Sequence, residues 1–86
     1  MPQKVIPIRM FEVQVATSVH WLTRNNFLIT TTDTISIYNL QGWICDLDIE
    51  IAGFIINSDI WEDNLLVCND VGTLYWIKLS EDYFEK

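Results

Sequence analysis

A repeat of about 40 residues is the feature that most restricts how this chain of 86 residues can fold. The segment pairs that carry it are 26–30 with 64–68, 35–40 with 74–79 and, more loosely, 18–21 with 58–61. Their offsets are 38, 39 and 40 residues, so one inserted residue reconciles the first two. A chain built from such units buries its apolar side chains between successive repeats and not in one closed core.

The composition favours strands within each unit. Isoleucine, valine and threonine supply 25 of the 86 residues, and alanine occurs only twice. Apolar and polar residues alternate in several stretches, while others such as 27–29 are continuously apolar and predict strands covered on both faces. Short turns separate these stretches, as in an all-β antiparallel meander. The expected strands are 4–15, 18–22, 26–31, 34–40, 43–51, 54–60, 64–69 and 73–79.

The strand endings Ile37-Tyr38-Asn39-Leu40 and Trp76-Ile77-Lys78-Leu79, with Gly72-Thr73 ahead of the second, resemble degenerate WD40-like repeats. The resemblance covers roughly residues 18–79. It implies a β-propeller, whose blades are four-stranded antiparallel sheets. We therefore expect about two blades of an incomplete ring.

The strand count suggests how the blades are phased. We expect residues 1–86 to form a single partial propeller unit, in which 4–15 is a spare outer-type strand. The remaining parts are a first blade over 16–51, a second blade lacking its outer strand over 52–80, and a polar tail over 81–86. The spare strand predicts that residues 1–15 complete a final blade. Two blades alone leave apolar faces in water, so a protein partner or further copies are expected to complete the ring.

Charge excludes some partners. The chain is acidic, with a net charge of −7, and its five lysines and arginines are scattered. Binding of nucleic acid or of an anionic membrane needs clustered cations, so neither is expected. No signal peptide or membrane-spanning run is visible, which predicts a cytoplasmic location with Cys45 and Cys68 as free, buried thiols. The single histidine gives no metal-ligand spacing, and no metal or cofactor is expected.

An acidic stripe is the first candidate interaction site. Residues 45–51 alternate between apolar and acidic side chains, which places Asp46, Asp48 and Glu50 on one face of the predicted strand 43–51. These carboxylates could meet a basic partner. The alternative is a solvated outer strand whose charges prevent edge-to-edge pairing.

The tryptophans are the second candidate. They are Trp21, Trp43, Trp61 and Trp76. Aromatic side chains dominate the energetics of interfaces, but in propellers they also fill the layers between blades, which is the expected role for most of them here. Trp61 stands beside Glu62 and Asp63 at a strand end and is the one expected to be exposed.

The sequence predicts no catalytic residue. Ser18, His20 and Asp59 could be drawn as a triad, but no nucleophile elbow or glycine-built oxyanion site accompanies them. The expected function is that of a non-catalytic protein–protein interaction scaffold, as a portion of a propeller in a larger complex. The alternative is a small self-contained β-barrel or sandwich that binds a small apolar ligand.

Overall fold

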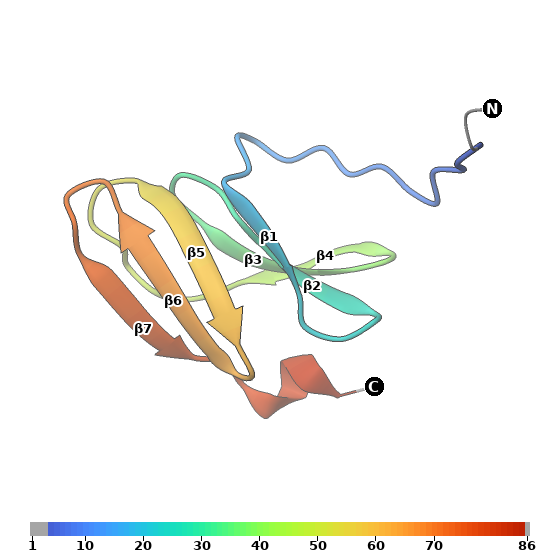
Figure 1. The fold of residues 1–86 in the computed structure, drawn as a ribbon. Coiled ribbons are helices and arrows are strands. Elements are labelled where there is room, and N and C mark those ends of the chain that lie inside the picture. The colour runs from blue at the N-terminus through green and yellow to red at the C-terminus, as the bar shows by residue number, and fades with distance from the viewer. Residues whose placement is uncertain (1–3, 86) are drawn as a thin grey trace.

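The computed structural model describes residues 4–85 and is all-β, with two antiparallel sheets and one short helical turn (Figure 1). The four-stranded sheet has the order β1-β2-β3-β4, with β1 Ser18–Trp21, β2 Asn26–Thr30, β3 Ile35–Asn39 and β4 Gly42–Asp46. The three-stranded sheet has the order β5-β6-β7, with β5 Ile55–Trp61, β6 Asn64–Asn69 and β7 Leu74–Lys78. Within residues 4–85, no helix is long and apolar enough to cross a bilayer.

Six predicted strands are confirmed to within two residues, and two predictions need correction. The strand predicted over 43–51 is β4, which starts at Gly42 and ends at Asp46, although the Leu47 amide still donates to the Ile35 carbonyl at 2.8 Å. The strand predicted over 4–15 is wrong for this chain. These residues, the N-terminal segment, make no ladder hydrogen bonds, because they contact the four-stranded sheet face-on and not along an edge.

The two sheets share one pairing register. In the four-stranded sheet Leu28 pairs with His20 on β1 and with Ile37 on β3. In the three-stranded sheet Leu66 pairs in the same way with Asp59 and Trp76. The equivalent positions are therefore offset by 39, 38 and 39 residues in the three successive strands. For the first strand, the pairing register gives an offset of 39, one residue less than the loose sequence match of 40.

The core lies between the sheets, which pack face to face. We call the face that each sheet turns toward the other its inner face, and the opposite one its outer face. The buried residues of the core are Leu28, Ile35, Ile37, Ile55, Leu65, Val67 and Leu79. Where β1 meets β5, a polar contact replaces apolar packing: the Ser58 hydroxyl is hydrogen-bonded to the Ser18 hydroxyl and, at 2.8 Å, to His20 Nε2.

Faces that are equivalent in the repeat do not meet each other. Leu28 and Ile37 point into the core, whereas their equivalents Leu66 and Trp76 lie on the outer face of the three-stranded sheet. Conversely, Leu65 is in the core, and its equivalent Phe27 lies on the outer face of the four-stranded sheet. The sheets are thus stacked head to tail. A stack of this kind does not close after two members, because it repeats the same contact in one direction.

The C-terminal tail is more ordered than its polar sequence suggests. Residues Glu81–Phe84 form a 3-10 turn, η1, which Ser80 caps by accepting a hydrogen bond from the Asp82 amide. Tyr83 and Phe84 pack against the core, and the Tyr83 carbonyl accepts a hydrogen bond from the side chain of Asn26. The apolar residues among the acidic ones therefore close one end of the space between the sheets.

Candidate interaction surfaces

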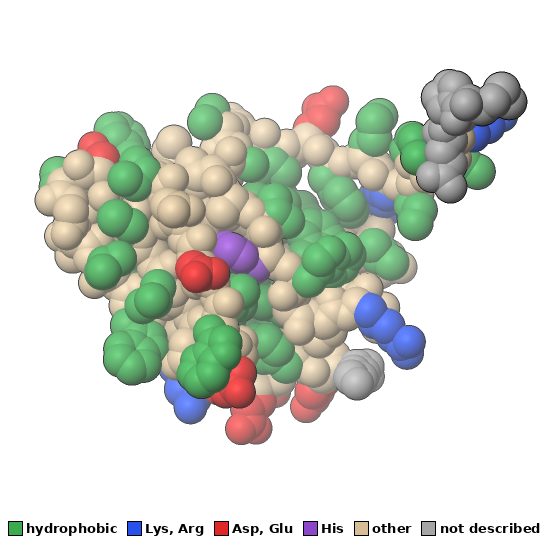
Figure 2. All heavy atoms as spheres, in the orientation of Figure 1, with side chains coloured by type: hydrophobic (Ala, Val, Ile, Leu, Met, Phe, Trp, Pro, Cys, Tyr) green, Lys and Arg blue, Asp and Glu red, His purple; other side chains and the backbone are tan. Residues whose placement is uncertain are grey.

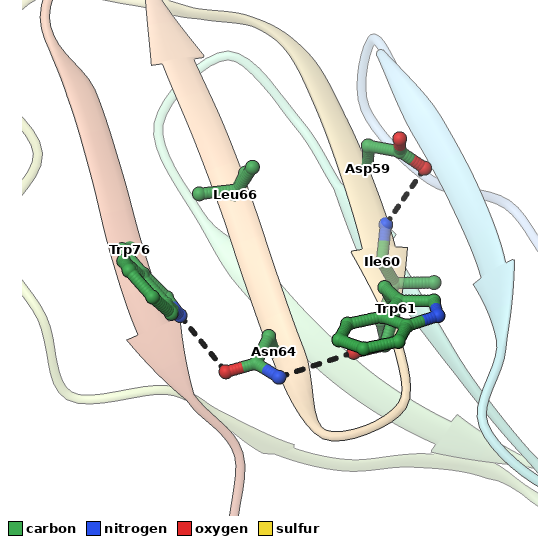
Figure 3. Close-up of a pocket in the computed structure, with 6 residues that line it drawn as sticks. All are labelled: Asp59, Ile60, Trp61, Asn64, Leu66 and Trp76. Atoms are coloured by element: carbon green, nitrogen blue, oxygen red, sulfur yellow. Dashed lines mark hydrogen bonds between the residues drawn. The ribbon is translucent and has the colours of Figure 1, made fainter.

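The outer face of the three-stranded sheet carries an open apolar groove of about 280 Å³ (Figure 3). We call it the Trp groove, and its lining residues are Asp59, Ile60, Trp61, Asn64, Leu66 and Trp76. The side chains come from all three strands, because pairing sets Asp59 and Trp76 on either side of Leu66. The two indoles are exposed by 73% and 76% and stand over the β6 side chains between them.

Asn64 fixes the geometry of the groove. Its side-chain oxygen accepts a hydrogen bond from Trp76 Nε1 at 2.8 Å, and its side-chain amide donates to the Trp61 carbonyl at 3.4 Å. The first bond orients the Trp76 indole, and the second ties the Asn64 side chain to the backbone of β5. A surface whose aromatic rings are already positioned loses little side-chain entropy when a partner binds.

The turn between β5 and β6 holds the first predicted site. Trp61 is exposed, as expected, and Glu62 occupies the left-handed region at φ 53°. Asp63 instead stabilises the fold: its carboxylate lies 3.5 Å from Lys78 Nζ, and its carbonyl accepts the Leu79 amide at 2.8 Å. Trp61 belongs to the Trp groove, whereas Glu62 and Asp63 line a separate hollow beside η1.

The acidic stripe is not a continuous strand face. Only Asp46 lies in β4, and Asp48 and Glu50 are exposed in the connection that leads to β5. The Asp46 carboxylate accepts hydrogen bonds from the Ser36 hydroxyl at 2.6 Å and from the Trp43 indole at 2.9 Å. These bonds, chiefly the one from Ser36, lower the pKa of Asp46 below its ordinary value. Asp46 is thus occupied within its own sheet.

The tryptophans depart from the expected core role, because all four are 60–76% exposed in this chain. Sequence reasoning singled out Trp61 but missed Leu66, Trp76 and Asn64. The signal was present in the continuously apolar stretches 65–68 and 74–77, which predict two covered faces, whereas the structure covers only one.

The outer face of the four-stranded sheet is partly covered by the N-terminal segment. The Phe11 ring packs edge-on against Phe27 and Tyr38 at centroid distances of 5.5 and 5.7 Å. As a result Phe27 is buried. On the β1 side of this face, Val19 and Trp21 stay exposed, and Figure 2 shows hydrophobic side chains gathered between this side and the segment.

Ser18, His20 and Asp59 do not come together as a catalytic triad in the structure. Ser18 and His20 both contact Ser58, but the Asp59 carboxylate lines the Trp groove and accepts the backbone amide of Ile60. Within residues 4–85, the His20 side chain makes no hydrogen bond other than the one to Ser58. The serine–histidine contacts tie β1 to β5.

The described part of the chain contains no group of three or more histidine, cysteine or acidic side chains placed to hold a metal ion. Cys45 and Cys68 are free thiols, but they are half-buried and not fully buried. No protein-family model, curated protein or solved structure matches the chain.

Proposed function

We propose that this chain is a non-catalytic protein–protein interaction scaffold, a two-sheet portion of a β-propeller that another polypeptide completes. The observation that carries the proposal is the uncovered outer face of the three-stranded sheet. Its exposed side chains include Leu66, Leu74 and Trp76, whose equivalents in the other sheet are core residues. A soluble chain gains stability when such a face is covered.

The head-to-tail stacking supports blades over the alternative of a closed sandwich. In a closed two-sheet body, the apolar faces meet each other and the remaining faces are polar. Here the apolar pattern continues on the outer face of the second sheet, and the pairing register that the two sheets share supports two repeats of one unit. Stacked copies are the arrangement in propellers, and the WD40-like strand endings point to the same fold.

Affinity would come from the Trp groove, and specificity from charges at its edge. Trp61 and Trp76 are the kind of anchors that dominate binding energy when a partner excludes water from them. Asp59 sits in the groove wall, and Glu62 lies in the adjoining turn. This combination favours a partner segment that is apolar and basic.

Site-specific cross-linking inside the cells that make the chain tests this function. Trp76→p-benzoylphenylalanine keeps an aromatic group in the groove and makes it photoreactive. The matched control is Asn25→p-benzoylphenylalanine, in the exposed turn between β1 and β2. We expect a discrete cross-linked polypeptide from position 76 and only background from position 25. Equal, diffuse labelling from both positions would contradict a docking role for the groove.

A further inference from the structure

Within residues 4–85, no strand pairs with the free side of β7 in the three-stranded sheet. In the four-stranded sheet, β3 pairs with β2 on one side and with β4 on the other. In the described part of the chain, its equivalent β7 pairs with β6 alone, over Leu74 to Lys78. The backbone groups on the other side of β7 form an open strand position next to the Trp groove, and an open edge readily accepts a further strand.

The chain itself presents the surface that fits the uncovered outer face. Because of the head-to-tail stacking, the outer face of the four-stranded sheet is equivalent to the inner face of the three-stranded sheet. The contact between the two sheets within one chain is therefore a template for a contact between two chains. In that second contact, Trp21 and Phe27 of one copy would take the positions that Ile60 and Leu65 hold in the first.

The N-terminal segment lies where a strand next to β7 would be needed. It runs along the β3–β4 side of the outer face, where Phe11 contacts Tyr38 and Arg9 donates to the Gln41 carbonyl at 3.2 Å. It leaves the β1 side bare for β5 and β6 of a neighbouring copy. Phe11, Val13 and Val15 alternate with polar residues, as in a strand, yet the segment pairs with no strand among residues 4–85.

The chemical character of the N-terminal segment also fits the Trp groove. The side chains of Val5, Ile6, Ile8 and Met10 are among the most exposed hydrophobic ones of the chain. Basic residues outnumber acidic ones within residues 4–15, whereas acidic residues dominate the rest of the sequence. An apolar and basic segment complements an apolar groove whose wall contains the Asp59 carboxylate.

In this structure the N-terminal segment does not lie beside β7 of its own chain. Figure 1 shows it on the outer side of the four-stranded sheet, with the whole core between it and β7. With the segment in this position, the strand that covers β7 has to come from a different molecule.

We propose that the occupant of this surface is a second copy of the chain. The outer face of its four-stranded sheet docks on the outer face of the first copy's three-stranded sheet, and its N-terminal segment pairs with β7 as the fourth strand. This proposal rests on the proposed function and names its partner. The contact is head to tail, so each added copy presents the same free surface until a ring closes. Propellers with 4–8 blades would take about two to four copies.

Copies of the full chain with two different affinity tags, co-expressed, test self-association through recovery of the second tag. Proline removes the backbone donor that strand pairing needs, and consecutive residues of a strand point their donors in opposite directions. We therefore compare Glu12→Pro and Val13→Pro with the matched controls Glu12→Ala and Val13→Ala. At least one proline variant should lower recovery about tenfold, and the alanine variants less than about threefold.

Further measurements distinguish a loss of folding from a loss of self-association, and self-association from binding of a different protein. Circular dichroism should be unchanged in the proline variants, because the N-terminal segment contributes no ladder hydrogen bonds to the fold. Trp76→Asp, on the opposite docking surface, should also lose the second tag. The proposal is overturned if the unmodified chain recovers none of the second tag, or if both proline variants recover as much as it does. A discrete cross-link from position 76 to a different protein, without self-recovery, would leave the interaction function standing and refute the second copy as the partner.

Discussion

Asp46 illustrates how a residue that looks like a surface charge can belong to the fold. Its carboxylate accepts hydrogen bonds from Ser36 and Trp43, which lower its pKa relative to the unfolded chain. A lowered pKa stabilises the folded state above the ordinary aspartate pKa of about 4, and this contribution is lost as the pH falls through the folded value.

The prediction is that Asp46→Asn is less stable than the unmodified chain at pH 7, by no more than about 1 kcal/mol because the group is exposed. The difference should shrink as the pH falls below about 4, where the carboxylate of the unmodified chain becomes protonated. Urea denaturation across this pH range measures it. Asp48→Asn, in the exposed connection, is the control and should have almost no effect; equal losses in both variants would show that the hydrogen bonds of Asp46 do not matter.

Gly53 is a residue whose conformation the fold depends on. It has a φ of +67°, and a Cβ there would lie 2.2 Å from Asp70 Oδ1, the atom that accepts the Phe54 amide at 2.9 Å. Gly53→Ala should therefore strain the backbone and displace this carboxylate, at a cost of about 2–3 kcal/mol.

Gly72→Ala separates these two effects, because Gly72 also has a positive φ but has nothing within 4 Å of its Cβ position. It should lose about 1 kcal/mol less than Gly53→Ala in the same denaturation experiment. If the two variants lost the same stability, the contact with Asp70 would play no part.

At the scale of the elements, two neighbouring leucines of β6 allow the contributions to folding and to association to be measured separately. Leu65 is fully buried in the core, whereas its neighbour Leu66 is 42% exposed in the Trp groove. Leu65→Ala should lower the free energy of unfolding by about 3 kcal/mol, and Leu66→Ala by about 1 kcal/mol or less.

The association readouts should show the reverse order. Leu66→Ala should weaken recovery of the second tag, while folding stays nearly intact. Both variants are compared at one fixed protein concentration, since binding itself adds to apparent stability. A Leu66 variant that associates normally would remove the groove from the interface.

The sequence predicted strands correctly where its pattern depends only on residues that are neighbours along the chain. Alternation and turn residues located β1 to β3 and β5 to β7, because strand periodicity depends on neighbouring residues alone. The N-terminal segment was misjudged for the opposite reason. Its alternation is that of a strand, but a strand also needs a paired edge, and that edge is supplied by tertiary structure.

The site was harder to predict than the fold. The exposure of Trp61 followed from its place beside the turn, but the fates of Trp76 and Leu66 depend on which sheet face is covered. A continuously apolar stretch says that both faces of a strand are suited to burial. It does not say whether the covering surface belongs to the same chain.

At the scale of the whole molecule, the two outer faces differ in how they are covered. The four-stranded sheet has the N-terminal segment on its outer face, whereas the three-stranded sheet has an exposed groove and an open edge at β7. On the face that Figure 2 shows, several acidic side chains gather at the end of the molecule near η1 and the β5–β6 turn, and others lie singly elsewhere. The two outer faces therefore differ, and in the proposed assembly the first supplies a strand whereas the second receives it.

The most direct test is the native mass of the full chain by light scattering over a range of micromolar concentrations, followed by a thermal melt of the same samples. We predict a discrete assembly of two to four copies whose melting temperature rises with concentration, because association stabilises the fold. A folded monomer at every concentration, with a single cooperative transition that does not shift, would contradict the claim that a second copy of the chain completes this body.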